Sequence, residues 1–220
     1  MAEAEDRLSR LITHGREERY LEYKGSGPGE SLRWSGNADT GDNDNTVREK
    51  LARSIMAMAN LEEGGDIVLG MEQVGPDNWD AAGLSDDAAN TFRQDSVQEW
   101  VNERADPSVQ LTVYQHAWRS KQFVIVRVQG FDEVPVVGVR GTGSRQGLRE
   151  SAMYVRSRGK HETAEVSAYE DMRSLLDRAI DIGIERRLKP FGRLLESLLQ
   201  LPTGGSRMDE ERFQQRQDDL

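Results

Sequence analysis

A short cluster of charged residues near the N-terminus carries side chains suited to phosphate chemistry. In Leu21-Glu22-Tyr23-Lys24 polar and apolar residues alternate, which predicts a strand at 21–24. Residues i and i+2 of a strand share a face, so Glu22 and Lys24 are expected side by side, with Glu17 a few residues upstream. A carboxylate here can hold a divalent metal, and the ammonium can offset the charge on a transferring phosphate. An exposed charge pair on a solvated face is the alternative interpretation.

A third acidic residue, Glu72, follows the apolar run 67–71, which is typical of a central strand covered on both faces. A helix is expected at 47–60, and a β-α-β crossover places successive strands side by side, so Glu72 is expected near Glu22. Carboxylates of Glu17, Glu22 and Glu72 at one point would repel each other unless a cation lay between them. Oxygen ligands without Cys or His suit Mg²⁺ or Mn²⁺. The alternative is that Glu72 is an ordinary polar loop residue.

Residues 140–160 form a basic stretch in an acidic chain. They hold six basic residues against one acidic residue, while the whole chain has a net charge of -10. A local positive segment of this kind favours contact with a phosphate backbone, and an aromatic residue within it can stack on a base. The alternative is that it offsets the acidic segment 25–46. The candidate nucleic-acid-binding residues are Arg140, Arg145, Arg149, Tyr154, Arg156, Arg158 and Lys160.

Composition excludes several classes of protein. The chain has 29 Lys and Arg against 39 Asp and Glu, which excludes a protein that coats nucleic acid by overall charge. It has no cysteine, which excludes disulfides, Cys-zinc sites and thiol chemistry. No apolar run approaches the roughly 20 residues needed to span a bilayer, and the acidic N-terminus does not resemble a secretory signal. We therefore expect no membrane partner and a cytoplasmic location.

The order of the expected elements predicts an α+β fold, with a mixed β-sheet flanked by helices and a C-terminal helical extension. Helices are expected at 4–14, 47–60, 86–104, 168–187 and 191–201, with a break at Pro190. Strands are expected at 21–24, 67–71, 109–118, 122–128, 134–140 and 152–156. The expected organisation is a domain at 1–165, a helical extension at 166–201 and a disordered tail at 202–220. The Leu-rich segment 168–201 is a candidate surface for a homo-oligomer.

Several of these residues together resemble the Schlafen AlbA-type domain. The resemblance begins with the pattern Glu17-x4-Glu22-x-Lys24 and continues with Ala57-Met58-Ala59-Asn60, Gly64-Gly65 and a strand ending Gly70-Met71-Glu72. Pro135 and Tyr154-Val155-Arg156 follow in the order typical of that family. The resemblance to this family covers about residues 14–175. Glu72 departs from the family pattern, in which this position is usually Asp.

The resemblance implies a metal-dependent endonuclease. It places Glu17, Glu22 and Glu72 as ligands of Mg²⁺ or Mn²⁺, with Lys24 beside the phosphate. The implied substrate is RNA, tRNA-like or single-stranded, more than DNA, in a bacterial defence or stress system. Members of the family are also described as DNA-binding, so a non-catalytic nucleic-acid-binding regulatory module is a second hypothesis. A subunit of a larger assembly is a third.

Overall fold

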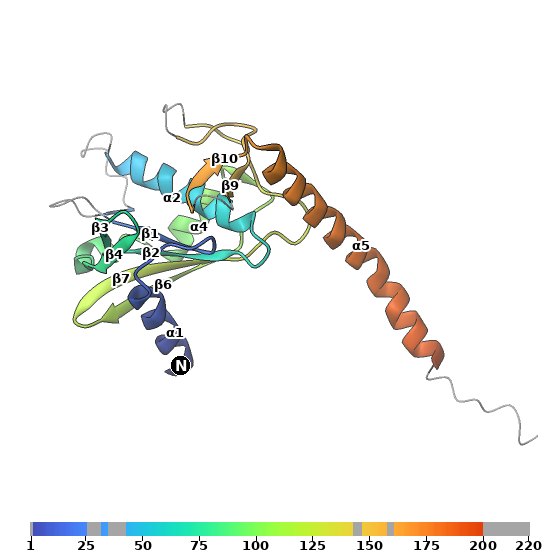
Figure 1. The fold of residues 1–220 in the computed structure, drawn as a ribbon, viewed down its shortest axis with the longest axis horizontal. Coiled ribbons are helices and arrows are strands. Elements are labelled where there is room, and N and C mark those ends of the chain that lie inside the picture. The colour runs from blue at the N-terminus through green and yellow to red at the C-terminus, as the bar shows by residue number, and fades with distance from the viewer. Residues whose placement is uncertain (1, 26–31, 35–42, 143–146, 158–160, 200–220) are drawn as a thin grey trace, which may run out of the picture. The chain divides into compact units, whose positions relative to one another are not determined.

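The protein is described here from a computed structural model, which covers residues 2–25, 32–34, 43–142, 147–157 and 161–199. Its helices are α1 (Ala2–Thr13), α2 (Asn43–Ala59), α3 (Asp86–Ala89), α4 (Gln94–Asn102) and α5 (Tyr169–Leu199). Its strands are β1 (Leu21–Lys24), β2 (Gly65–Leu69), β3 (Met71–Gly75), β4 (Asn78–Ala81), β5 (Ala105–Asp106), β6 (Leu111–Trp118), β7 (Lys121–Val128), β8 (Val137–Gly138), β9 (Tyr154–Arg156) and β10 (Thr163–Glu165). Figure 1 shows these elements. The predicted α+β class is confirmed.

The central sheet is mixed, with the strand order β1-β2-β7-β6. β1 and β2 are parallel, as the intervening helix α2 requires, and the other two pairs are antiparallel. Glu22 lies opposite Ile67 in the β1–β2 register. β1 is an edge strand of this sheet, so one side of its backbone is open to other groups.

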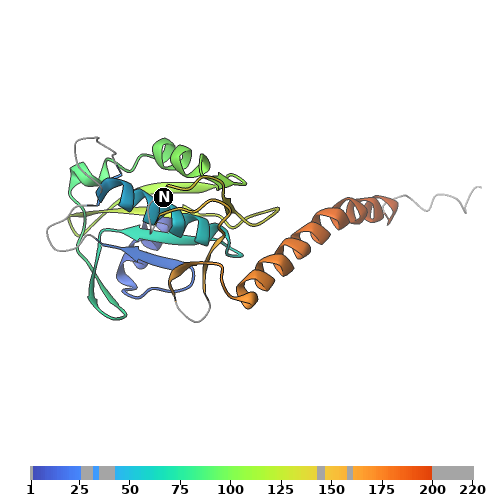
Figure 2. The same cartoon turned by 90° about the horizontal axis from the view of Figure 1, so that it is seen from above.

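Different helices cover the two faces of the sheet (Figures 1 and 2). On one face Leu21 and Tyr23 of β1 pack in a buried cluster with Ile12 of α1. On the other face Ser54 of α2 donates a hydrogen bond to Glu22. The period of two along β1 therefore sends Glu22 and Lys24 toward α2, while their neighbours enter the apolar core beside α1.

The segment between α2 and β2 explains the Asn and Gly-Gly of the sequence motif. Asn60 is buried, and its side chain makes three hydrogen bonds that join α2 to the segments carrying Val136 and Tyr154. Gly64 has a φ of +72°, and an added Cβ would lie 1.9 Å from the carbonyl oxygen of Val128. Only glycine fits this turn, which sets the start of β2 beside β1.

Several expected boundaries are wrong. The helix expected at 47–60 begins at Asn43, and the one expected at 86–104 is two short helices, α3 and α4. The β3–β4 hairpin and β10 were not expected at all. Pro190 lies inside α5, which runs on to Leu199 instead of breaking. The residues of the expected disordered tail, 202–220, lie outside the described residues.

The chain divides into two compact units, Met1–Ala179 and Ile180–Leu220. The first holds the sheet and the site described below. A search of the described residues finds no helix with the length and apolar character needed to span a membrane.

Candidate functional site

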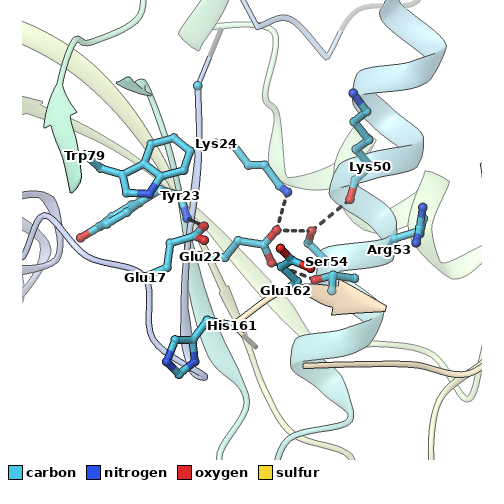
Figure 3. A pocket seen from close by; sticks show the side chains of 12 residues that line it. Glu17, Glu22, Tyr23, Lys24, Lys50, Arg53, Ser54, Trp79, His161 and Glu162 are labelled. Atoms are coloured by element: carbon cyan, nitrogen blue, oxygen red, sulfur yellow. Dashed lines mark hydrogen bonds and ion pairs between the residues drawn. The ribbon is translucent and has the colours of Figure 1, made fainter. Parts of the chain in front are cut away.

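A pocket of about 470 Å³ lies beside β1 (Figure 3). β1 contributes one wall, α2 a second, and the segment that leads into β10 a third, while Trp79 of β4 lies at the side. The lining residues are Glu17, Glu22, Tyr23, Lys24, Gly25, Lys50, Arg53, Ser54, Trp79, His161, Glu162 and Thr163. Three of the four predicted catalytic residues, Glu17, Glu22 and Lys24, therefore share one pocket.

Glu22 lies at the centre of this pocket and is only 4% exposed. Its Oε1 accepts a hydrogen bond of 2.8 Å from Ser54 and is ion-paired with Lys24. Its Oε2 accepts bonds of 2.6 Å from Arg156 and 3.0 Å from Thr163. Burial alone raises the pKa of a carboxyl. Here the charges of Lys24 and Arg156, with the hydrogen bonds, outweigh burial and hold the pKa of Glu22 below its ordinary value.

Arg156 is the buried counter-ion of Glu22. It is 1% exposed, and besides the carboxylate it donates to the carbonyl oxygens of Glu18 at 2.8 Å and Leu21 at 3.3 Å. The nucleic-acid-binding role expected for Arg156 does not agree with this placement, because its guanidinium offers no surface to a phosphate. Arg156 is the last residue of β9, and its guanidinium lies against the edge strand β1, where it holds the carboxylate of Glu22 in place.

Glu17 stands next to Glu22 in a different environment. Its Oε1 accepts a 2.8 Å hydrogen bond from the backbone N–H of Tyr23, so it caps the open edge of β1. Burial raises the pKa of Glu17 above its ordinary value, the charge of Glu22 adds to the rise, and the Tyr23 N–H, Arg156 and Lys24 act against it. The two carboxyl groups thus have pKa values moved in opposite directions. This arrangement suits one group that exchanges a proton beside one that stays ionised.

Cationic and aromatic side chains complete the pocket. Lys24 is held by Glu22, while its side chain keeps 28% of its surface exposed. Lys50 and Arg53 line the α2 wall. The ring of Trp79 lies 5.8 Å from the ring of Tyr23. Tyr23 itself is structural, since its hydroxyl donates to the carbonyl oxygen of Leu11 at 2.6 Å and burial raises its pKa to about 12.

Glu72 is not among the residues that line the pocket. It is exposed on β3, opposite Asp80 of β4. Within the described part of the chain, no group of three or more Asp, Glu, His or Cys side chains is placed to hold a metal ion. Both oxygens of Glu22 already accept bonds from protein donors, so a cation would have to displace Lys24 or Ser54 to reach Oε1. The donor set placed here does not fit the three-carboxylate centre expected from Glu17, Glu22 and Glu72.

Of the four described candidates in the predicted basic stretch, Tyr154 and Arg156 are buried, while Arg140 and Arg149 are exposed. Tyr154 is 1% exposed and its hydroxyl accepts a bond from the backbone of Arg149, so its ring cannot stack on a base. Arg149 is exposed and pairs with Glu165 at 3.0 Å. Arg140 is exposed. The remaining candidates, Arg145, Arg158 and Lys160, lie outside the described residues.

The sequence interpretation missed the pocket residues of α2 and the segment before β10. Ser54 had a usable signal, because it is a polar residue within the apolar stretch of α2 and must find a partner when buried. Thr163 had none, since it reaches Glu22 only through the pairing of β10 with β9.

The fold and the pocket define an α+β protein with a paired-carboxylate site at the edge of a mixed sheet. The chain belongs to the Schlafen AlbA_2 family, whose family model matches residues 17–165. This membership indicates a function related to nucleic acid.

Two solved structures are similar to part of this chain. The DIP2311 protein from Corynebacterium diphtheriae is 14% identical with a TM-score of 0.45, and the match covers 79% of this chain but only 28% of that protein. The N-terminal domain of a RecG-related protein from Nitrosomonas europaea is 18% identical with a TM-score of 0.38, covering 67% of this chain and 86% of the domain. Among curated proteins there is no match.

Proposed function

We propose that this protein binds nucleic acid at the β1 pocket and cleaves it there as an endonuclease, with RNA as the substrate. The observation that carries the proposal is the placement of two carboxyl groups, Glu17 and Glu22, in one pocket with Lys24, which is ion-paired with Glu22. Membership of the Schlafen AlbA_2 family supports nucleic acid as the ligand. The choice of RNA over DNA rests on the resemblance of the motif residues alone.

Each residue has a role that follows from its environment. Glu17, with a raised pKa, is suited to take or give a proton in the reaction. Glu22 stays ionised and positions Lys24, whose exposed ammonium offsets charge that develops on the phosphate. Lys50 and Arg53 on the α2 wall give the backbone of the ligand further cationic neighbours.

The participation of Mg²⁺ or Mn²⁺ stays a separate prediction. The resemblance implies it, whereas the carboxylates as placed do not form the expected centre. Activity measured in Mg²⁺, in Mn²⁺ and in excess chelator decides it. Loss of cleavage in chelator, together with loss in Glu72→Ala, would restore Glu72 to the site.

The experiment for the proposal is cleavage of a labelled tRNA and of single-stranded DNA by the full chain, its Glu17→Gln variant and a control. Arg10→Ala is a suitable control, because Arg10 is an exposed cation on α1 that pairs with Asp6. We expect the wild type and the control to cut RNA and Glu17→Gln to be impaired about 100-fold or more. Equal rates for Glu17→Gln and the wild type would remove Glu17 from the reaction.

A non-catalytic nucleic-acid-binding module is the second candidate function. The dense bonding of Glu22 favours it, because a buried carboxylate with four protein donors also serves as an internal support for the pocket. In that case nucleic acid binds with strong salt dependence, and no cleavage appears under any of the metal conditions.

The proposal also includes a homo-oligomer formed through residues 168–201. Support comes from the apolar residues that α5 leaves exposed. A place in a defence or stress system remains a prediction.

A further inference from the structure

Helix α5 carries a stripe of exposed apolar side chains. Leu176, Ile180, Ile184, Leu188 and Phe191 are each between 50% and 62% exposed. They are spaced by four, four, four and three residues, so they lie on one face of the helix. A contiguous apolar surface of this kind marks an interaction site on a protein that is otherwise polar.

The distribution of charge along α5 indicates which partner fits this apolar face, namely a second copy of the same helix. From Tyr169 to Glu185 the helix has five acidic residues against two basic ones, and from Arg186 to Phe191 it has three basic residues and no acidic one. Two copies of such a helix attract each other when they run in opposite directions, because each acidic half then lies beside a basic half. Side by side in the same direction, like charges would meet and repel.

The spacing of the stripe also sets a register. The four residues Leu176, Ile180, Ile184 and Leu188 are symmetric about position 182, so an antiparallel copy places Leu176 opposite Leu188 and Ile180 opposite Ile184. In that same register Asp177 falls opposite Arg187. All the equally spaced apolar residues are then paired. Within one copy Asp177 lies 3.8 Å from Arg173, so Arg187 of the second copy would share or replace that exposed contact.

We propose that α5 pairs with α5 of a second copy of this chain in an antiparallel, two-fold symmetric dimer centred near Ile182. Because the contact is isologous, the same residues serve both copies and the assembly closes at two. The inference rests on the homo-oligomer of the proposed function and gives it a direction and a register. It is independent of the nuclease proposal, because it uses α5 alone.

Sedimentation equilibrium of the full chain tests the dimer. We expect a mass about twice the 24.8 kDa of one chain. Ile184→Lys places a charge in the stripe and should weaken dimerisation at least tenfold. Glu185→Lys places the same lysine one residue along, off the stripe, and should keep the dimer. A monomeric wild type, or a dimer unaffected by Ile184→Lys, would overturn the proposal.

Cysteine crosslinking tests the direction, and the absence of native cysteine makes it unambiguous. Asp177 and Arg187 are ten residues apart, or about 15 Å along a helix, beyond the roughly 7 Å that a disulfide tolerates between Cα atoms. In the antiparallel dimer, Asp177→Cys and Arg187→Cys chains should form an oxidised dimer when co-expressed, and neither should do so alone. Crosslinking of either variant with itself would indicate a parallel pair and refute the register.

Discussion

Replacing Arg156 by alanine is expected to destabilise the protein by about 3–5 kcal/mol, the usual cost of removing one partner of a buried ion pair. The guanidinium is 1% exposed and contacts Glu22 at 2.6 Å, with further bonds to two backbone carbonyl groups. Its loss leaves the Glu22 carboxylate buried with fewer donors and leaves the carbonyl groups of Glu18 and Leu21 with one donor less. The effect therefore falls on β1 and on the pocket together.

Arg149→Ala is the matched comparison. Arg149 was also expected to bind nucleic acid, and it too makes an ion pair, with Glu165 at 3.0 Å, but its side chain is 70% exposed. An exposed pair contributes at most about 1 kcal/mol, because water screens the charges. Replacing arginine by alanine should therefore lower the free energy of unfolding much more at position 156 than at position 149, although both lie in the same basic stretch.

Urea unfolding followed by circular dichroism measures the difference in free energy of unfolding, and a thermal melt of the same variants measures the shift in Tm. At about 2–4 °C per kcal/mol for a domain of this size, Arg156→Ala should lower the Tm by about 6–20 °C and Arg149→Ala by about 4 °C or less. If the two variants unfold within about 1 kcal/mol of each other, the buried ion pair is not present and Arg156 is a surface residue. The assignment of Glu22 as an ionised support would then fail as well.

Three further predictions concern the pocket. Glu17→Gln should gain stability relative to the wild type as pH rises from about 4 to 7. The raised pKa of Glu17 in the folded protein stabilises the wild type fully only below the ordinary pKa of Glu, and this contribution is lost as pH rises through the pKa of the folded state. The measurement is the free energy of unfolding of both proteins at each pH. The pKa of Glu22 is lowered in the folded protein, so its contribution to stability changes with pH in the opposite direction. The wild type should lose stability as pH falls through the lowered pKa of Glu22, and Glu22→Gln should not show this loss. Trp79→Leu should weaken binding of single-stranded RNA by about 5- to 150-fold in a fluorescence titration, the value of about 1–3 kcal/mol for a stacked base.

Each of these has a clear contrary result. A stability difference between Glu17→Gln and the wild type that does not change with pH would mean that burial does not perturb Glu17. A Glu22→Gln variant with the same acid dependence as the wild type would place the acid-sensitive group elsewhere. Unchanged RNA affinity in Trp79→Leu would make Trp79 a packing residue beside Tyr23.

The part of the site that is local in sequence could be predicted. Alternation along residues 21–24 predicted that Glu22 and Lys24 share a face, and the pairing of β1 with β2 through α2 followed from the general rule for crossovers. Local pattern also predicted the fold class, because periodicity and glycine turns mark most of the elements.

The long-range contacts could not be predicted. Arg156 reaches Glu22 across 134 positions of sequence. The residue type alone does not distinguish an arginine that forms a buried ion pair from one that faces solvent. Glu72 was misplaced for a related reason. The apolar run 67–71 looked like one strand, whereas Gly70, with a φ of +104°, turns the chain into the β3–β4 hairpin. Glu72 is exposed on β3 opposite Asp80, and it is not a lining residue of the pocket although its backbone passes beside Gly25.

Photo-crosslinking of the full chain to a short RNA that carries 4-thiouridine, with the attached peptides mapped by mass spectrometry, tests most directly whether the β1 pocket is the nucleic-acid site. Crosslinks are expected on the peptides that contain Lys24, Lys50 and Trp79, and they should disappear in Lys24→Glu but not in Arg10→Ala. Crosslinks confined to Arg140 and Arg149, or unchanged by Lys24→Glu, would contradict the account and move the binding surface away from the paired carboxylates.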